Sequence, residues 1–173
     1  MKLSDLTREQ TTPVDYQTAK FDYERCKDQD SAKPVRHPVV VVGAGPIGMS
    51  LAIDLAQRNV PVLILDNDVS LSVGSRAICF AKRTLEIFDR LGVGEPMMDK
   101  GVSWNVGKVF FKDEQLYSFN LLPESGHERP AFINLQQYYC EGYLAERVAR
   151  LPLVQLRWQN KVVGVEQRAD HVR

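Results

Sequence analysis

The chain has 173 residues, of which 44% are hydrophobic and 25% charged, a composition typical of a globular protein with one ordinary core. Basic and acidic residues both number 22, so no excess of positive charge points to nucleic acid or to an anionic membrane surface. We therefore expect small molecules or further copies of the chain as partners. The cysteines are Cys26, Cys79 and Cys140, without a C-x-x-C pair or a cluster with histidines, which argues against a disulfide framework and a metal site.

The start of the chain carries no continuous apolar core of the kind that a signal peptide needs. No run elsewhere is long enough to span a membrane, and the expected location is the cytoplasm. Residues 1–37 are rich in charged and polar groups without a sustained period. We interpret them as an extended arm that lies over the domain or over a partner subunit.

An apolar run breaks into glycines at residues 38–50, with the sequence Pro-Val-Val-Val-Val-Gly-Ala-Gly-Pro-Ile-Gly-Met-Ser. This pattern predicts a strand, a phosphate loop and the start of a helix. Gly43 would make the tight turn, Gly45 would let the backbone approach a pyrophosphate, and Gly48 would let the helix pack closely on the strand. Pro46 suits the first helical position, and the helix N-terminus offers free N–H groups to an anion.

The residues that follow place this loop in a strand–helix–strand unit. The helix has apolar residues at one-face spacing and ends at Arg58-Asn59; these residues are Ile47, Leu51, Ala52, Leu55 and Ala56. A second apolar strand at 61–65 ends on Asp66, 23 positions after Gly43, close to the spacing of an acid that binds an adenosine ribose. The alternative is that Asp66 only begins a turn with Asn67 and Asp68.

A long loop at residues 67–81 interrupts any simple alternation of strand and helix. Its small residues around Arg76 fit a segment that lies along a phosphate-bearing ligand, and a solvated surface arginine is the alternative. Residues 82–91 then predict an amphipathic helix that Gly92 ends. Its inward residues are Leu85, Phe88 and Leu91.

The second half of the chain predicts a β-hairpin at residues 106–119, whose aromatic side chains we expect in a core. A helix from about 136 to 150 carries Cys140, Leu144 and Val148 on one face, which places Gln136 and Gln137 at its start. Two strands, 154–158 and 161–166, flank a Gln159-Asn160 turn. The chain ends at Arg173, where we expect the approach to another strand.

Five segments together resemble the FAD-dependent aromatic hydroxylases, the single-component flavoprotein monooxygenases. They are the glycine loop at 39–49, Asp66, Gly-Ser-Arg-Ala-Ile at 74–78, Arg-Thr-Leu-Glu-Ile at 83–87 and Gln-x-x-x-Glu-x-x-Leu at 137–144. The resemblance covers about residues 38–168. It implies an α/β fold, a Rossmann-like FAD-binding domain with a parallel sheet, helices and a β-hairpin.

The resemblance also implies a set of cofactor contacts. The FAD pyrophosphate would be held by Gly43, Gly45, Pro46, Ile47 and Gly48. Asp66, where the family more often has glutamate, would bind the adenosine ribose with Asn67 beside it. Arg76 and Ala77 would contact the flavin cofactor, Gln137 would lie on the cofactor-facing helix, and Val162 would approach the adenine through its backbone.

In the family, NADH or NADPH reduces the flavin, and the reduced flavin with oxygen hydroxylates a small aromatic substrate. No catalytic acid, base or nucleophile is needed from this part of the chain, and we name none. Family members are longer and carry Asp-Gly and Gly-Asp segments that this sequence lacks. We therefore expect residues 38–173 to be the N-terminal part of a truncated FAD-binding domain, without the substrate domain.

Two other function classes stay open. A fragment of an NAD-dependent dehydrogenase would use the same glycine loop and Asp66, but it would continue as regular strand and helix repeats, which residues 67–81 do not. A non-catalytic nucleotide-binding or assembly piece is the other alternative, and it is favoured if the protein ends at Arg173.

Overall fold

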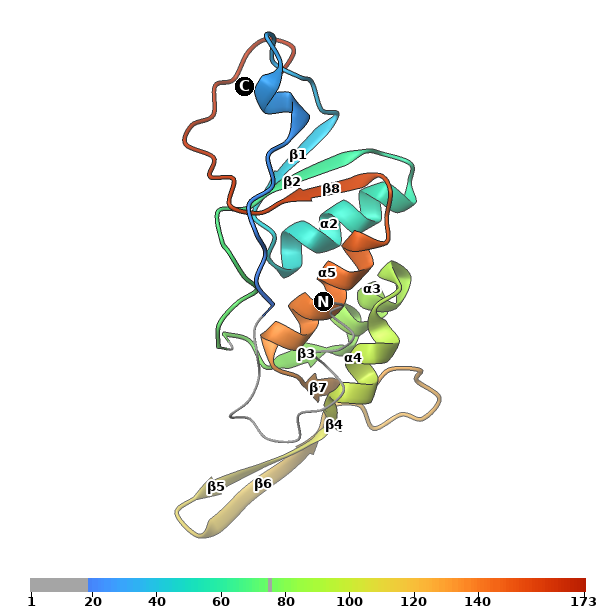
Figure 1. Ribbon diagram of the computed structural model, residues 1–173. Helices are drawn as coiled ribbons and strands as arrows, with labels where there is room; N and C mark the ends of the chain where they lie inside the picture. The colour runs from blue at the N-terminus through green and yellow to red at the C-terminus, as the bar shows by residue number, and fades with distance from the viewer. Residues whose placement is uncertain (1–18, 75) are drawn as a thin grey trace. The chain divides into compact units, whose positions relative to one another are not determined.

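The computed structural model describes residues 19–74 and 76–173 (Figure 1). Its contacts divide the chain into two compact units, one of residues 1–73 with 144–173 and the other of residues 74–143. The predicted arm before Ala19 lies outside the described residues, as does Ser75. The described part of the arm contains a short 3-10 helix, η2 (Lys27–Asp30).

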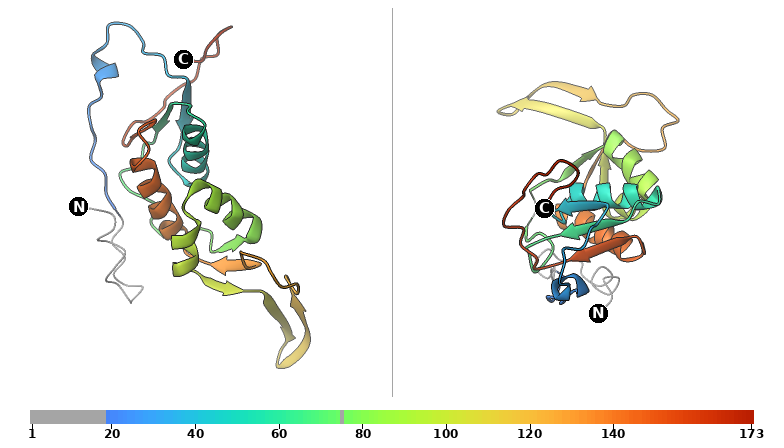
Figure 2. Two further views of the ribbon diagram at one scale, coloured as in Figure 1. Left: turned by 90° about the vertical axis from the view of Figure 1, so that its right-hand side faces the viewer. Right: turned by 90° about the horizontal axis from the view of Figure 1, so that it is seen from above.

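A parallel sheet of three strands forms the centre of the first unit. Its strands β1 (Val39–Val42), β2 (Val62–Leu65) and β8 (Val154–Arg157) follow in the order β1-β2-β8. Helix α2 (Pro46–Gln57) connects β1 to β2 and packs on this sheet (Figure 2). The strand–helix–strand unit that the sequence predicts is thereby confirmed.

Helix α2 buries a face that differs in part from the predicted one. Gly48 lies against the end of β1, so the inward residues are those one, four, five and eight positions later: Met49, Ala52, Ile53 and Ala56. Ala52 and Ala56 were expected there. The expectation was wrong for Ile47, which is 83% exposed, and for Leu51, which is also exposed. Apolar spacing identified the helix, but the contact of Gly48 with the strand sets its rotation.

The second unit has its own antiparallel sheet, in the order β3-β7-β4. It consists of β3 (Cys79–Ala81), β7 (Phe132–Asn134) and β4 (Val102–Trp104), joined by helices α3 (Lys82–Leu91) and α4 (Gly94–Lys100). Helix α3 has the predicted bounds and the predicted buried face, and Gly92 ends it at a φ of +81°. Helix α4 and these three short strands were not predicted.

Arg129 links the two helices of this unit. Its guanidinium donates to both oxygens of Asp89 on α3, through Nε and Nη2 at 2.6 Å each, and to Glu95 on α4. The side chain is buried, and these hydrogen bonds raise the pKa of Arg129 above its ordinary value. Arg129 therefore stays protonated at any physiological pH. Its hydrogen bonds hold α3 and α4 together.

Helix α5 (Gln137–Ala149) contributes its first half to the second unit and its second half to the first unit. Cys140, Leu144 and Val148 are buried, as the sequence predicts. Burial, together with the nearby charge of Glu141, raises the pKa of the Cys140 thiol to about 12. No helix in the described part of the chain is long and apolar enough to cross a membrane.

The predicted hairpin is present as β5 (Val106–Phe111) and β6 (Glu114–Asn120), but its aromatic residues do not fill a core. Phe110, Phe111 and Tyr117 are each more than half exposed, so that expectation was wrong. A two-stranded ribbon has no second layer of its own in which to bury them. One ring is used within the ribbon, because Phe119 covers Gly107, where an added Cβ would lie 2.2 Å from the ring.

The predicted strand at 161–166 does not form in the described chain. Residues after β8 run on without sheet pairing until the isolated bridge between Gln167 and Val172. Val163 is 91% exposed and Val165 is also exposed. A β-branched run becomes a strand only when a neighbouring strand supplies hydrogen-bond partners, and in the described chain Glu166 at the end of this run bonds with Arg173 while residues 161–165 pair with no strand.

Candidate functional site

The glycine loop between β1 and α2 makes the tight turn that the sequence predicts. Gly43 has a φ of +104°, a conformation that side chains with a Cβ rarely adopt. Its N–H donates to the carbonyl of Leu65 at the end of β2, with an N···O distance of 2.8 Å. The turn is thus fixed to the neighbouring strand at the carboxyl edge of the sheet, where ligands bind in open α/β folds.

The other two glycines of the loop differ in what surrounds them. A Cβ added at Gly48 would lie 2.0 Å from the carbonyl oxygen of Gly43 and 3.2 Å from Cγ1 of Val41. A Cβ added at Gly45 would meet nothing within 4 Å. Gly48 therefore permits close packing of helix on strand, whereas Gly45 borders open space at the helix start that a ligand can fill.

Helix α2 begins at the loop with an N-terminus suited to an anion. Gly45 is the N-cap, Pro46 occupies the first turn, and no side chain in the described part of the chain caps the helix. The first backbone N–H groups of a helix have no intrahelical partner, and the helix dipole adds partial positive charge there. The N-terminus of this 12-residue helix thus presents backbone N–H donors and positive potential to the space beside Gly45.

The carboxylate of Asp66 lies at the carboxyl end of β2 and contacts the same loop. Its Oδ2 accepts a hydrogen bond from the N–H of Ala44, and its Oδ1 accepts one from the N–H of Asp68 at 2.7 Å. Each carboxylate oxygen has a second lone pair, so both can still accept from a ribose hydroxyl. Asn67 is exposed, and its side-chain amide donates to the carboxylate of Asp68 at 3.2 Å.

The predicted adenine contact follows a turn that is joined to Asp66. The N–H of Asn160 donates to the Asp66 carbonyl at 2.7 Å, and the N–H of Gln159 donates to the Asp68 carbonyl at 3.3 Å. The Gln159-Asn160 turn is therefore present as predicted, and Gln159 has a φ of +58°. Val162 is half-buried two residues after this turn.

In the second unit, the antiparallel sheet pairs the two segments that lead to the other predicted contacts. Cys79 on β3 pairs with Asn134 on β7, and the N–H of Leu135 donates to the Ile78 carbonyl at 2.7 Å. Arg76 and Ala77 come just before strand β3, and Gln137 begins α5 three residues after Asn134. The register thus pairs residues 78–79 with residues 134–135, and Arg76 and Ala77 are exposed.

The side chain of Gln137 is oriented by the helix that it begins. Its Nε2 donates to Oε1 of Glu141 at 2.7 Å, one helical turn further along α5. Glu141 is only 2% exposed, so its carboxylate is a fixed acceptor within this unit. A buried charged acceptor of this kind restrains the rotamer of Gln137, the glutamine for which the resemblance predicts a cofactor contact.

A polar cluster on the same sheet was missed by the sequence analysis. Oδ1 of Asn134 accepts hydrogen bonds from Nε1 of Trp104 at 2.9 Å and from Sγ of Cys79 at 3.2 Å. The three residues come from three different strands of the sheet. No short motif contains them, and only the strand register reveals that they meet.

Comparison with known proteins agrees with this geometry. The model of a family described as "FAD binding domain" matches residues 36–173. A flavin-dependent monooxygenase of Mycobacteroides abscessus is 28% identical over 142 residues, which are 78% of this chain and 30% of that protein. A probable NADH-specific resorcinol 4-hydroxylase of Rhodococcus jostii is 31% identical over 135 residues, covering 75% of this chain and 25% of the relative.

A solved structure has a similar fold. The p-nitrophenol 4-monooxygenase of Pseudomonas putida superimposes with a TM-score of 0.71 at 26% identity, over 79% of this chain and 35% of that one. The chain spans about a third or less of the length of these relatives. Since the family model covers most of the chain, the protein belongs to the FAD-binding domain family of the flavin-dependent aromatic hydroxylases.

Proposed function

We propose that this chain supplies the part of an FAD site that holds the pyrophosphate and the adenosine, within an NAD(P)H-dependent monooxygenase that hydroxylates a phenolic or other aromatic substrate. One observation carries the proposal: Gly45 borders open space at the uncapped start of α2, beside the carboxylate of Asp66. Donors, positive potential and room for a diphosphate thus occur next to an acceptor for a ribose.

The residues take distinct roles in this proposal. Gly43, Gly45 and Gly48 with Pro46 and Ile47 shape the loop whose backbone N–H groups bind the pyrophosphate. Asp66, with Asn67 beside it, accepts hydrogen bonds from the ribose. The backbone at Val162 contacts the adenine. In the second unit Arg76 and Ala77 contact the flavin cofactor, and Gln137, held by Glu141, does so from the start of α5.

When bound, FAD supplies the redox chemistry with NADH or NADPH and oxygen, while the protein binds, orients and excludes water. The comparisons support this class of reaction, because relatives are named for hydroxylation of resorcinol and of p-nitrophenol. Both names describe monocyclic phenols, and we extend that substrate class to the complete protein that contains this chain.

Titration of the purified protein with FAD tests the proposal. We expect flavin absorbance to remain with the protein after gel filtration, and we expect ADP to compete with FAD. Binding of NAD without any uptake of FAD would overturn the proposal and would support the dehydrogenase alternative. A protein that binds neither nucleotide would overturn both.

A further inference from the structure

The segment of residues 19–30, here called the arm segment, lies along the first unit and precedes the family match that begins at residue 36. Lys20 forms an isolated antiparallel bridge with Ser70. The N–H of Phe21 donates to the Val69 carbonyl at 2.8 Å, and the N–H of Leu71 donates to the Ala19 carbonyl at 3.4 Å. The arm segment is therefore attached to the chain that leaves the carboxyl end of β2.

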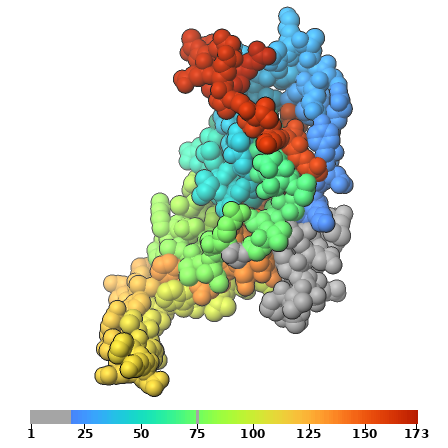
Figure 3. Space-filling model, turned by 90° about the vertical axis from the view of Figure 1, so that its left-hand side faces the viewer, coloured from blue at the N-terminus to red at the C-terminus, as the bar shows by residue number. Residues whose placement is uncertain are grey.

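Phe21 is the anchor of this attachment. Its ring stacks on Trp158 with a centroid distance of 4.3 Å and an interplanar angle of 3°. Its carbonyl accepts a hydrogen bond from Nε2 of Gln159 at 2.8 Å. The ring, the carbonyl and the N–H of Phe21 thus all contact segments that follow β2 or β8. Figure 3 shows the arm in blue beside the C-terminal segment in red on one face of the molecule.

The turn that Phe21 contacts is the same turn that holds Asp66. Gln159 has a φ of +58°, which is unfavourable for a residue with a side chain, so its surroundings must hold it there. Asn160 donates to the carbonyl of Asp66 at 2.7 Å. A continuous series of contacts therefore runs from Phe21, through Trp158 and Gln159, to the predicted ribose acceptor.

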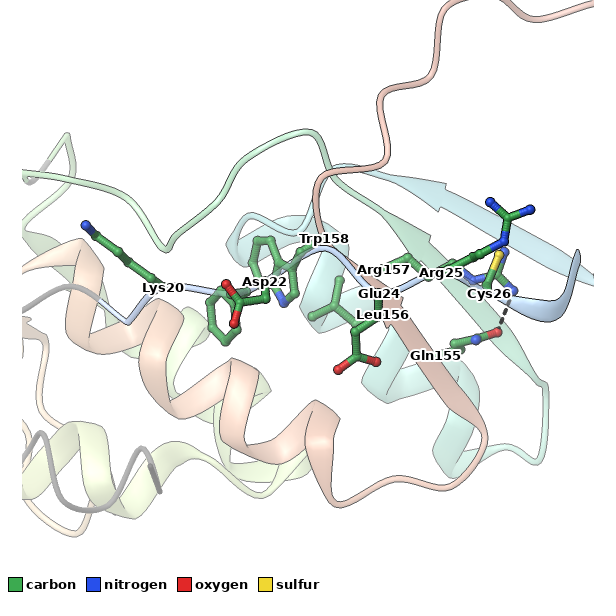
Figure 4. Close-up of a pocket in the computed structure, with 10 residues that line it drawn as sticks. Lys20, Asp22, Glu24, Arg25, Cys26, Gln155, Leu156, Arg157 and Trp158 are labelled. Atoms are coloured by element: carbon green, nitrogen blue, oxygen red, sulfur yellow. Dashed lines mark hydrogen bonds between the residues drawn. The ribbon is translucent and has the colours of Figure 1, made fainter. Parts of the chain in front are cut away.

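A second attachment fixes the other end of the arm segment. Asp28 in η2 accepts a hydrogen bond from Nη2 of Arg157 at 2.6 Å and pairs with Nε2 of His37 at 2.8 Å. The side chain of Arg157 is only 10% exposed. Between the two attachments the arm segment and β8 border an open hollow of about 380 Å³, and Figure 4 shows Lys20 at one end of it, Trp158 further along, and Gln155 with Cys26 at the other end.

We propose that the arm segment is a positioning element of the FAD site. It fixes the turn at residues 158–160 and thereby positions the residues that bind the adenosine part of FAD. This inference rests on the proposed function and adds to it a part of the chain outside the family match. Ordering the turn before the nucleotide arrives lowers the entropy that binding must overcome. Loss of the arm contacts should weaken binding of any ligand that carries the adenosine diphosphate.

Phe21→Ala in the full chain tests this inference, with Tyr23→Ala as the matched control. Tyr23 lies on the same segment, is exposed, and pairs its hydroxyl within the arm, with Gln29. By calorimetric titration we expect Phe21→Ala to raise the Kd for FAD and for ADP by the same factor, about tenfold. Tyr23→Ala should leave both constants within about twofold of the wild type.

Two further variants separate positioning from general loss of fold. Phe21→Tyr keeps a stacking ring and should restore wild-type affinity. Gln159→Gly relieves the left-handed backbone while removing the bond to the Phe21 carbonyl, so it should weaken FAD and ADP binding without lowering the Tm. Wild-type affinity in both Phe21→Ala and Gln159→Gly would overturn the inference. A wild-type protein that binds no FAD would instead overturn the proposed function.

Discussion

The carboxylate of Asp66 accepts a hydrogen bond from the backbone N–H of Ala44, so the end of β2 holds the glycine loop in place. The same carboxylate accepts from the N–H of Asp68 through its other oxygen. The side chain of Asp66 thus holds the loop that would bind a pyrophosphate, and it is also the predicted ribose acceptor. A change at this residue should affect both folding and nucleotide binding.

Asp66→Asn replaces one of the two acceptor oxygens by an amide that cannot accept a hydrogen bond. We expect the free energy of unfolding to fall by about 1–3 kcal/mol, since one backbone donor loses a charged partner. FAD affinity should fall as well. Urea denaturation and FAD titration measure the two effects, with Arg83→Ala as the control at an exposed position outside the proposed site. Unchanged values of both would contradict the bracing role.

The glycine loop offers a pair of substitutions with opposite expected profiles. Gly48→Ala places a Cβ against the backbone oxygen of Gly43 and should destabilise the fold by about 1–3 kcal/mol. Gly45→Ala meets no protein atom and should cost less than about 1 kcal/mol, yet it fills the space assigned to the pyrophosphate. Thermal melts with and without FAD distinguish the two. If FAD raised the Tm of Gly45→Ala as much as that of the wild type, this space would not be the place of the pyrophosphate.

Arg76→Ala should weaken FAD binding without lowering the Tm, because its side chain and the residues that follow it up to Cys79 are exposed. Arg83→Ala is the matched control, since Arg83 is also exposed and pairs with Glu86 on its own helix. Both variants are titrated with FAD under identical salt, which screens exposed charges equally. Equal affinities for the two variants and the wild type would make Arg76 a solvated surface residue.

Arg129→Met removes the cation between α3 and α4 and leaves the carboxylate of Asp89 without its buried partner. We expect a loss of about 3 kcal/mol in the free energy of unfolding. Glu95→Gln should cost less than about 1 kcal/mol, because the Glu95 side chain is 74% exposed and water replaces the interaction. Chemical denaturation of both variants measures the difference. Similar losses of unfolding free energy in the two variants would show that the exposure of a side chain does not determine how much it contributes to this ion-pair network.

The attachment of the arm segment at Asp28 should depend on pH in one direction. Hydrogen bonds from Arg157, and then from His37, lower the pKa of Asp28 below its ordinary value. An acid whose pKa is lower in the folded state than in the unfolded state stabilises the native protein. This contribution is fully present at pH values above the pKa of the unfolded state, near 4, and it is lost as the pH falls through the pKa of the folded state. The stability difference between the wild type and Asp28→Asn should therefore shrink as the pH falls below about 4.

Acid denaturation curves of the two proteins measure this difference. The amide that replaces the carboxyl in Asp28→Asn cannot titrate, so any change of the difference with pH belongs to the carboxyl of Asp28 and its partners. A difference that grows as the pH falls would contradict the lowered pKa. High salt should reduce the difference only in part, because Arg157 is nearly buried.

Elements with a strong local signal could be predicted from the sequence. The helix at 82–91 has three apolar residues on one face and a glycine at its end, and the structure gives it the same bounds. The glycine loop needs a left-handed residue between a strand and a helix, and Gly43 provides it. In each case the residues that determine the structure are neighbours in the chain.

Elements that depend on a partner could not be predicted in the same way. Strands β3, β4 and β7 have three residues each, too few to show a period, and they exist because each pairs with another. The valines at 162–165 have the composition of a strand but no described partner, and they remain unpaired. The aromatic residues of the hairpin were expected in a core because the sequence does not reveal which layers are present.

The same distinction between local and long-range signals applies to the candidate site. Gly43, Gly45, Gly48 and Asp66 were recognised from spacing within one strand–helix–strand unit, and the structure brings them to one edge of its sheet. The contacts of Gln137 with Glu141 and of Phe21 with Trp158 needed coordinates. Phe21 lies far from Trp158 in the chain, and nothing in either local sequence indicates that their rings stack.

The pairing of Cys79 with Asn134 also determines where the chain tolerates changes of length. Strand β7 is held on both sides, by β3 and by β4, so extra residues in the hairpin turn or between 121 and 130 leave that pairing intact. One residue inserted between Asn134 and Gln137 would instead turn the start of α5 by about 100° relative to the sheet. Insertions and deletions among relatives should therefore collect in the hairpin and avoid the two residues before α5.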